Sequence, residues 1–338
     1  MARKRRLTKK QKRMRLGFLL VIVSFLLGVF VGYSTRTGES IWNHFQQQVN
    51  QASHSLNEQL SEIQRRTLSP QKKEDQIHIL DVGQGSAVLL QAKSGENILI
   101  DSGRHDDSDK RMISYLDQMI GTGGTIDLAI FTHTDSDHIG HADLIFDYYD
   151  VKEVWSNGKD NTTQIYFDFL TAIKHSGAKY VEPKAGEKRQ LGDFTIDVLH
   201  PVAGQSYKDQ NEASIIGRIQ LNDLSFMFSG DASYSIEDQV IESATVPLKS
   251  DLLLVGHHGS KYSIGRNWLK AVQPDVAFFQ AGKDNMYGHP HSQLKKRLKE
   301  AGIPLYGTID LGTISIYIDD EGQVNVETEK AKKAVVSE

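Results

Sequence analysis

Hydrophobic and polar residues follow three successive patterns along the chain. Residues 16–33, LGFLLVIVSFLLGVFVGY, contain no charged side chain, and as a helix they would span about 27 Å, enough to cross a bilayer. Residues 41–63 place apolar side chains three or four positions apart, which predicts a helix with one apolar stripe. From residue 76 onward, short β-rich runs lie between turns that contain Gly and Asp, which predicts a folded domain of mixed α and β structure.

The runs after residue 76 divide into candidate strands and candidate helices. The strands are so numerous that two stacked sheets are favoured over one. The candidate strands are residues 77–82, 87–92, 97–103, 128–133, 153–157, 194–200, 216–221, 224–231, 251–258, 276–282 and 313–319. The candidate helices are residues 111–120, 162–177, 266–272 and 292–302, and Asn161 with Gln164 would form a capping box at the start of the second.

The patterns predict five segments of the chain. They are a basic segment 1–15, a transmembrane anchor 16–33, a helical stalk and linker 34–75, a catalytic domain 76–325 and a charged, frayed tail 326–338. Segment 1–15 holds nine of the 39 Lys and Arg residues and no acidic residue, so we expect it to stay in the cytoplasm. The predicted location is the cell membrane, single-pass, with an extracellular catalytic domain. A cleaved signal peptide is the alternative, although YSTRTGES offers no small-x-small cleavage site.

Two features of the N-terminal region bear on self-association. Gly28 and Gly32 form a GxxxG pair that would let two anchors approach each other. The apolar stripe of residues 41–63 is typical either of a short coiled coil that pairs protomers or of a helix that lies against the catalytic domain or the membrane surface. A homodimer through the stalk or the GxxxG pair therefore remains one of the alternatives.

Charge and cysteine content narrow the chemistry. Outside residues 1–15 the chain has 30 basic and 43 acidic residues, a formal charge of −13, which disfavours tight sequence-independent DNA binding unless a local basic groove exists. The chain contains no cysteine, which excludes disulfides, thiolate metal sites and a cysteine nucleophile. Any metal must therefore be held by imidazole and carboxylate groups.

Four ionisable residues lie within six positions in the stretch FTHTDSDHIGH, which directly follows a candidate strand. In an extended turn, His133 and Asp135 would face one metal ion, while Asp137 and His138 would face a second. The alternative interpretation is an acidic, solvated loop with incidental histidines.

Two further strand ends carry ionisable groups. Asp231 ends the run LSFMFSGD, and His257 and His258 end the run DLLLVGHH. These positions fit a site shared with the first cluster, because sites commonly form in the loops that follow regular elements. Asp231 could instead cap a helix that begins near Ser235.

Six motifs in this order resemble those of one family. They are DVGQGSA (81–87), DSG (101–103), HTDSDHIGH (133–141), SGD (229–231), HHGS (257–260) and YGHPH (287–291). Over roughly residues 76–325 the chain is similar to the metallo-β-lactamase-fold domain of ComEC-type competence proteins. The resemblance implies an α+β fold, an αββα sandwich with a binuclear metal site at one edge of two packed sheets.

The resemblance also implies roles for individual residues. His133 and Asp135 would bind the first metal, Asp137 and His138 the second, and Asp231 would bridge them. His200 is a further candidate ligand, with Asn211 as its alternative, and His258 is preferred to His257 as a ligand. Asp137, His257 and His289 would be the catalytic residues, with a turn-stabilising role as the alternative for His289. Lys261 and Arg104, which lie next to site motifs, are candidate phosphate contacts, with surface charges as the alternative. The additional carboxylate, Asp135, makes Mn²⁺ a rival to Zn²⁺.

Two positions depart from the pattern of the family that the chain resembles. Ser86 stands where the motif DVGQGD has an acid, and His141 stands where HxGG has a glycine. Whatever the missing carboxylate does would be altered here. His141 would be a further ligand, a substrate contact or a surface residue on a relaxed turn.

These observations predict a membrane-anchored, metal-dependent hydrolase, and most specifically a phosphodiesterase or nuclease of ComEC type with two divalent ions. The expected substrate is DNA. A phosphodiester of a cell-wall polymer, such as a teichoic-acid or phosphocholine group, is the alternative hydrolase substrate. A non-catalytic, membrane-tethered binding scaffold is the alternative of another class.

Overall fold

The computed structural model describes residues 74–107, 109–318 and 324–330, which form a sandwich of two β-sheets. One sheet has eight strands in the order β15-β14-β1-β2-β3-β4-β5-β6, and the other has seven in the order β13-β12-β11-β10-β9-β8-β7. The strands of the first sheet are β1 Asp75–Ile79, β2 Val88–Gln91, β3 Asn97–Ile100, β4 Thr125–Phe131, β5 Asp150–Ser156, β6 Lys179–Val181, β14 Ile314–Ile318 and β15 Val324–Thr328. Those of the second are β7 Lys188–Leu191, β8 Phe194–His200, β9 Ile216–Leu221, β10 Leu224–Phe228, β11 Leu252–Leu254, β12 Val276–Phe279 and β13 Leu305–Gly307.

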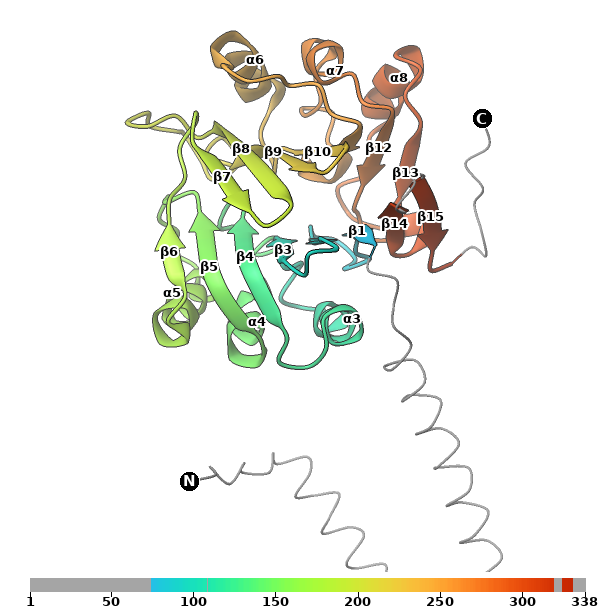
Figure 1. Cartoon of the computed structure of the whole chain (residues 1–338). Coiled ribbons are helices and arrows are strands. Elements are labelled where there is room, and N and C mark those ends of the chain that lie inside the picture. The colour runs from blue at the N-terminus through green and yellow to red at the C-terminus, as the bar shows by residue number, and fades with distance from the viewer. Residues whose placement is uncertain (1–73, 108, 319–323, 331–338) are drawn as a thin grey trace, which may run out of the picture. The chain divides into compact units, whose positions relative to one another are not determined.

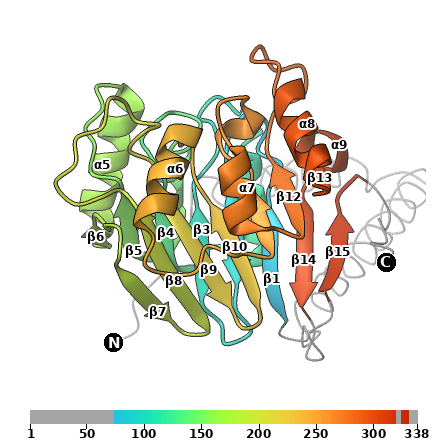
Figure 2. The same ribbon diagram turned by 90° about the horizontal axis from the view of Figure 1, so that it is seen from above.

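Helices cover the outer face of each sheet, so the molecule has four layers (Figure 1). The helices on the eight-stranded sheet are α3 Arg111–Met119, α4 Ala142–Tyr148 and α5 Gln164–Ser176. Those on the seven-stranded sheet are α6 Tyr234–Ser243, α7 Arg266–Val272 and α8 Ser292–Glu300, seen side by side in Figure 2. The short α9, Thr308–Leu311, follows β13. The αββα sandwich implied by the resemblance is confirmed.

Three apolar clusters hold the layers together. The first lies between the sheets, where residues such as Ile77 and Ile100 of one sheet meet Phe226 and Phe278 of the other. The other two lie under the helices of each face. Under α5, for example, the ring centroids of Phe131 and Phe169 are 4.9 Å apart in an edge-to-face arrangement. Burial of apolar surface on both faces of each sheet explains why the central strands read as nearly continuous apolar runs.

Each strand and helix predicted after residue 76 corresponds to an element of the structure, but several elements were not predicted. The missed strands β6, β7, β13 and β15 are short edge or near-edge strands, and β7, KRQL, is largely exposed. The expected end of the domain at residue 325 falls inside β15, which pairs with β14 through Thr328, so the tail is ordered further than predicted. The cap of α5 is Thr163, whose hydroxyl accepts from the amide of Tyr166, and not Asn161.

The predicted location requires a correction. No helix among the residues that the structure describes combines the length and the apolar character needed to cross a bilayer, which contradicts the assignment as a single-pass cell-membrane protein. The segments from which that assignment came, residues 1–15, 16–33 and nearly all of 34–75, lie outside the described residues, as does the GxxxG pair.

Candidate metal centre

Strand ends from both sheets converge at one edge of the sandwich. Strands β3 to β6 are parallel in the first sheet, and β10 to β13 are parallel in the second, so the carboxyl ends within each set lie at a common edge. Polar side chains follow these ends directly. They are Asp101 after β3, His133 after β4, Asp231 after β10, His257 and His258 after β11 and Gln280 after β12.

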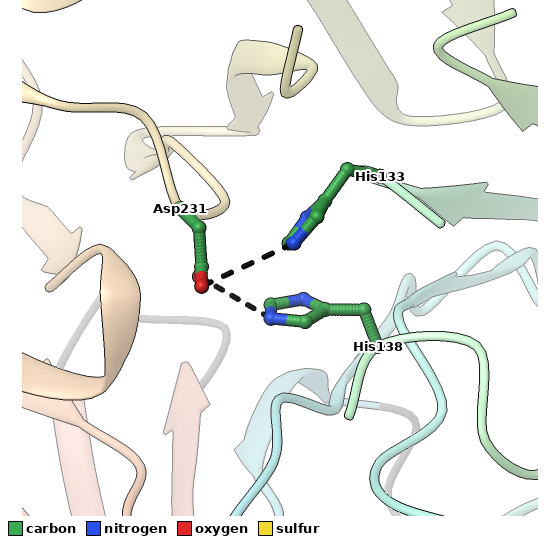
Figure 3. Close-up of side chains that lie close together, drawn as sticks. All are labelled: His133, His138 and Asp231. Atoms are coloured by element: carbon green, nitrogen blue, oxygen red, sulfur yellow. Dashed lines mark ion pairs between the residues drawn. The ribbon is translucent and has the colours of Figure 1, made fainter. Parts of the chain in front are cut away.

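The loop between β4 and α4 supplies the first group of potential ligands. His133, His138 and Asp231 each offer an atom within 4.8 Å of the others, and all three residues are buried. His133 Nε2 lies 4.0 Å from Asp231 Oδ2, and His138 Nε2 lies 3.2 Å from Asp231 Oδ1, as Figure 3 shows. The two histidine rings come from the same loop and point toward a carboxylate of the other sheet.

A second group overlaps the first. It consists of Asp137, His138 and His258, again with atoms within 4.8 Å of one another. His258 Nε2 lies 3.2 Å from Asp137 Oδ2. His138 belongs to both groups, but its Nε2 atom has one lone pair and can bind only one ion at a time.

Asp231 lies between the two groups. Its Oδ2 faces His133 and His257, at 4.0 and 3.6 Å, whereas its Oδ1 faces His138 at 3.2 Å. Burial by itself raises the pKa of Asp231, but the imidazoles of His138, His257 and His258 outweigh it and hold the pKa well below its usual range. The carboxylate is therefore ionised and offers one oxygen to each side.

The same balance applies to neighbouring groups. Burial raises the pKa of Asp137, but His258 and His138 outweigh it and lower the pKa below its usual range. Burial lowers the pKa of His138, but the carboxylates of Asp231 and Asp101 raise it well above its usual value. Carboxylates and imidazoles at this distance thus favour each other's charged forms, and a cation between them would replace the imidazole proton.

Hydrogen bonds orient the rings in a way that suits metal binding. In several site histidines the Nδ1–H donates to a fixed oxygen, which leaves Nε2 as the atom with a lone pair. The pairs are His138 with Asp101 Oδ2 at 2.8 Å, His258 with the Gln280 carbonyl at 3.1 Å and His200 with the Ser214 carbonyl at 2.7 Å. In the part of the chain that the structure describes, the buried Nε2 atoms of His133, His138, His200 and His258 have no hydrogen-bond partner.

The surroundings of these unpartnered nitrogens indicate whether the residues fit a metal ion. A buried polar atom without a hydrogen bond is costly, and here the Nε2 atoms of His138 and His258 have only ion-pair contacts, at 3.2 Å, with carboxylate oxygens. Several of them beside ionised carboxylates, and aimed by bonds at the opposite ring nitrogen, are what a divalent cation with imidazole and carboxylate ligands requires. The donor set therefore fits Zn²⁺ or Mn²⁺.

Backbone conformation marks the same positions. Asp101, His257 and His258 adopt left-handed backbone, with φ of 58°, 52° and 52°. Non-glycine residues pay a free-energy cost for this conformation, and such residues cluster at functional sites. The conformation lets Asp101 reach Thr132 and His138 together, since its carboxylate accepts from the Thr132 amide at 2.8 Å and from His138.

Two of the three predicted catalytic residues are partly exposed, and the third, His289, is buried. The side chains of Asp137 and His257 are 26% and 31% exposed, whereas that of His258 is only 4% exposed. His289 stacks on His258 with a centroid distance of 6.3 Å. Burial, together with the charges of His258 and His257, lowers the pKa of His289 to about 4. His258 and His289 are thus buried, whereas Asp137 and His257 are partly exposed.

Three other predicted contributors are not brought into either group. Asp135 Oδ2 is 3.6 Å from His133 Nε2, but the side chain is 41% exposed. His200 is buried, with its ring against that of Tyr207, and its Nε2 lies outside both groups. Asn211 is partly exposed and contributes its backbone carbonyl to the amide of Ser214. These three remain predictions.

The remaining residues singled out in the sequence lie outside both groups of potential ligands. Arg104 pairs with Asp106 at 2.8 Å, and the Lys261 ammonium lies 5.0 Å from the Tyr262 ring centroid. His141 is buried at the start of α4, with Nδ1 on the Ser102 carbonyl, and belongs to neither group. Gly140 provides the close approach instead, because a Cβ there would lie 2.2 Å from the His105 amide nitrogen.

Two supporting residues had not been assigned a role from the sequence. Asp101 lies in the motif DSG, whose position after a strand was the only available signal. Gln280 follows β12 in the run VAFFQAG, and nothing in its sequence context marks it. The cap of α6 is Ser233, so Asp231 is free of the capping role that was its alternative.

Comparisons with known proteins find related sequences. The Metallo-beta-lactamase superfamily model matches residues 80–283. ComE operon protein 3 of Bacillus subtilis is 30% identical over 264 residues, which are 71% of this chain and 33% of that protein. Recombination protein 2 of Haemophilus influenzae is 30% identical over 227 residues, which are 66% of this chain and 26% of that protein. The metallo-beta-lactamase fold protein YhfI from Bacillus subtilis superposes with a TM-score of 0.47 and 14% identity, over 70% of this chain and 98% of that chain. The chain thus spans a third or less of the length of these two curated relatives.

Proposed function

The chain belongs to the metallo-beta-lactamase superfamily, and on this premise we propose that it is a phosphodiesterase that uses two divalent metal ions. One observation carries the proposal: buried imidazole nitrogens without hydrogen-bond partners converge on the carboxylates of Asp137 and Asp231. Two ions on either side of Asp231 would satisfy these atoms together. His133, with Asp135, would hold one ion, and Asp137, His138 and His258 would hold the other.

Bound ions would supply Lewis acidity, lowering the pKa of water toward neutrality and neutralising charge on the attacked phosphorus. The chain's own residues would do the rest. Asp137 Oδ2 faces His258, which leaves Oδ1 to orient the attacking water and accept its proton. His257, on the open side, would contact a phosphoryl oxygen, and His289 would donate a hydrogen bond to the leaving group. No nucleophilic side chain is required.

DNA is the substrate that we propose, because the resemblance is to ComEC-type competence proteins and a similar protein is named Recombination protein 2. The match covers a third or less of those proteins, so DNA cleavage by this chain has to be tested directly. The acidic body of the chain makes a cell-wall phosphodiester the substrate to test beside DNA.

The experiment compares the wild type with Asp137→Ala after metal depletion and reloading with Mn²⁺ or Zn²⁺. Bis-p-nitrophenyl phosphate, DNA and a phosphocholine ester are assayed in parallel. We expect metal-dependent turnover of bis-p-nitrophenyl phosphate and DNA by the wild type and its loss in the variant. Two bound ions without turnover of any substrate would indicate another ester class, and neither ions nor turnover would indicate a binding scaffold.

A further inference from the structure

Gln280 connects the two sheets beside the metal centre, although the proposed chemistry does not use its side chain. It follows β12 of the seven-stranded sheet and is buried. Its Nε2 donates to the carbonyls of Leu80 and Ala87, at 2.8 and 2.6 Å, which lie in the connection between β1 and β2 of the eight-stranded sheet. Its Oε1 accepts from the Ala87 amide and the Ser86 hydroxyl, both at 3.3 Å. One amide group thus uses both donor hydrogens and its acceptor across the gap between the sheets.

The backbone carbonyl and the side-chain amide of Gln280 are each connected by hydrogen bonds to one of two potential ligands, His258 and Asp137. Its backbone carbonyl accepts from His258 Nδ1 at 3.1 Å. On the other side, Ser86, which bonds to its side chain, donates its amide to the carbonyl of Asp137 at 3.0 Å. The last contact of the set is between Asp137 Oδ2 and His258 Nε2, which lie 3.2 Å apart. Gln280, Ser86, Asp137 and His258 therefore form a ring of polar contacts around one side of the metal centre.

The ring joins ligands that no regular structure joins. Asp137 lies in a loop of the first sheet and His258 in a loop of the second, so only contacts between the sheets fix their separation. Metal affinity depends steeply on that separation, since each ligand atom must lie within a few tenths of an ångström of its bonding distance. Groups that orient ligands affect metal affinity by about 10- to 100-fold when they are removed.

The chemistry of the ring also accounts for Ser86. A hydroxyl can donate to Gln280 Oε1, whereas the acid of the motif DVGQGD can only accept when ionised. An ionised acid at this position would face the Gln280 oxygen and would place a further negative charge near Asp137. Ser86 and Gln280 thus form a matched donor and acceptor.

We propose that Gln280 is a positioning residue that sets the separation of Asp137 and His258 and thereby the affinity of the ion that these two residues hold. This inference rests on the binuclear site of the proposed function. The role belongs to the side-chain amide, because substitution of the side chain leaves the backbone carbonyl that orients His258 in place.

The test is calorimetric titration of the metal-depleted full chain with Mn²⁺, applied to the wild type, Gln280→Met and Ser86→Ala. We expect two ions in the wild type. In Gln280→Met, one affinity should fall tenfold or more while the other stays within about twofold, and Ser86→Ala should weaken the same ion by about fivefold. In a His258→Ala background, which retains one ion, adding Gln280→Met should change the remaining affinity by less than threefold.

A matched control is Gln91→Met, which removes a partly buried amide bonded to Asn97, away from the metal centre, and should leave both affinities unchanged. A second tie between the sheets, from the Gly282 amide to Gln84 Oε1, remains in every variant and supports folding. Far-UV circular dichroism of each metal-free variant establishes that it is folded. If Gln280→Met does not fold, the test rests on Ser86→Ala: weaker binding of one ion alone supports the inference, and equal weakening of both ions, or of neither, overturns it.

Equal weakening of both ions, or of neither, in these variants would overturn the inference and leave the proposed function standing. A wild type that takes up fewer than two ions would overturn both, and this result is read from the wild type alone. Loss of one affinity in Gln91→Met to the same extent as in Gln280→Met would also overturn the inference.

Discussion

His78 and His138 are equally buried, with 2% and 1% of their surface exposed, but their ring nitrogens have opposite surroundings. In β1, His78 Nδ1 meets the Ser315 hydroxyl at 2.8 Å, and its Nε2 meets the side-chain oxygens of Gln76 and Gln91 at 3.1 and 3.2 Å. In the metal centre, His138 uses Nδ1 on Asp101 and leaves Nε2 without a hydrogen bond. Burial of a histidine therefore does not identify a potential ligand, whereas an unpartnered ring nitrogen that faces a carboxylate of the same cluster does.

The two histidines also differ in their electrostatic surroundings, which shift their pKa values in opposite directions. His78 is surrounded by neutral groups, and burial lowers its pKa to about 4, with the hydrogen bond to Gln91 opposing the shift. Near His138, the carboxylates of Asp231 and Asp101 outweigh burial and raise its pKa. The first histidine stays neutral and contributes to stability, and the second lies where a cation is favoured.

Replacing a ligand should abolish function, whereas replacing the structural histidine should not. In His138→Ala we expect loss of at least one of the two ions and a fall in turnover on the order of 10³-fold or more, because both potential ligand groups contain His138. His78→Ala should keep both ions and its turnover per folded molecule. Metal analysis by mass spectrometry and turnover of bis-p-nitrophenyl phosphate measure both effects. Retention of both ions by His138→Ala would remove the distinction between the two histidines.

Metal removal should destabilise the protein through the site alone. When free metal exceeds its dissociation constant by about 1,000-fold, binding contributes about 4 kcal/mol, which corresponds to a melting temperature on the order of 10 °C higher. A chelator should therefore lower the melting temperature of the wild type and of His78→Gln by equal amounts, and that of His138→Ala by less, because this variant has fewer ions to lose. Differential scanning calorimetry provides the test. An identical wild-type melting temperature with and without chelator would contradict the assigned site.

Acid should destabilise the protein through His78 in a pH range set by its pKa. Because the pKa of His78 is lowered from 6.5 to about 4, the unfolded state binds a proton between these values while the folded state does not. The free energy of unfolding should thus fall with pH from about 6.5 downward, by about 2.5 kcal/mol at pH 4.5. Urea unfolding of the metal-free wild type and His78→Gln at pH 7.5 and 4.5 isolates this contribution. A pH-independent difference between the two proteins would show that His78 is not held neutral.

His289 should have the smallest effect, because it lies beside the ligands without belonging to either group. In His289→Ala we expect turnover to fall by about tenfold, with both ions retained, since the variant loses a single hydrogen bond to the leaving group. A substrate with a better leaving group should recover part of the loss. Loss of an ion would instead place His289 among the ligands.

The sequence predicted those parts of the site that are contiguous or that end long apolar runs. His133 to His138 follow the buried strand β4, and His258 follows β11, so the periodicity located both. The Asp101 bond to His138 and the Gln280 link between the sheets could not be predicted in this way, because they join residues 37 and 193 or more positions apart. The pairing of β3 with β4 brings Asp101 to His138, and the packing of one sheet on the other brings Gln280 to Leu80 and Ala87.

The fold shows the same division between strong and weak local signals. The central strands and the helices α3, α5, α7 and α8 have clear apolar periodicity and were predicted. Strand β7, with side chains that are mostly exposed, forms because its backbone pairs with β8, and no apolar pattern accompanies it. Helix α4 follows the metal-site loop directly, and the polar motif concealed its start at His141.

The central claim is that two divalent ions bind on either side of Asp231. Anomalous diffraction at the manganese absorption edge from crystals of the Mn²⁺-loaded protein tests it most directly. We predict two peaks, one beside His133 and the Oδ2 atom of Asp231, and one beside Asp137, His258 and the Oδ1 atom of Asp231. Peaks elsewhere, or no peak within bonding distance of these residues, would contradict the claim.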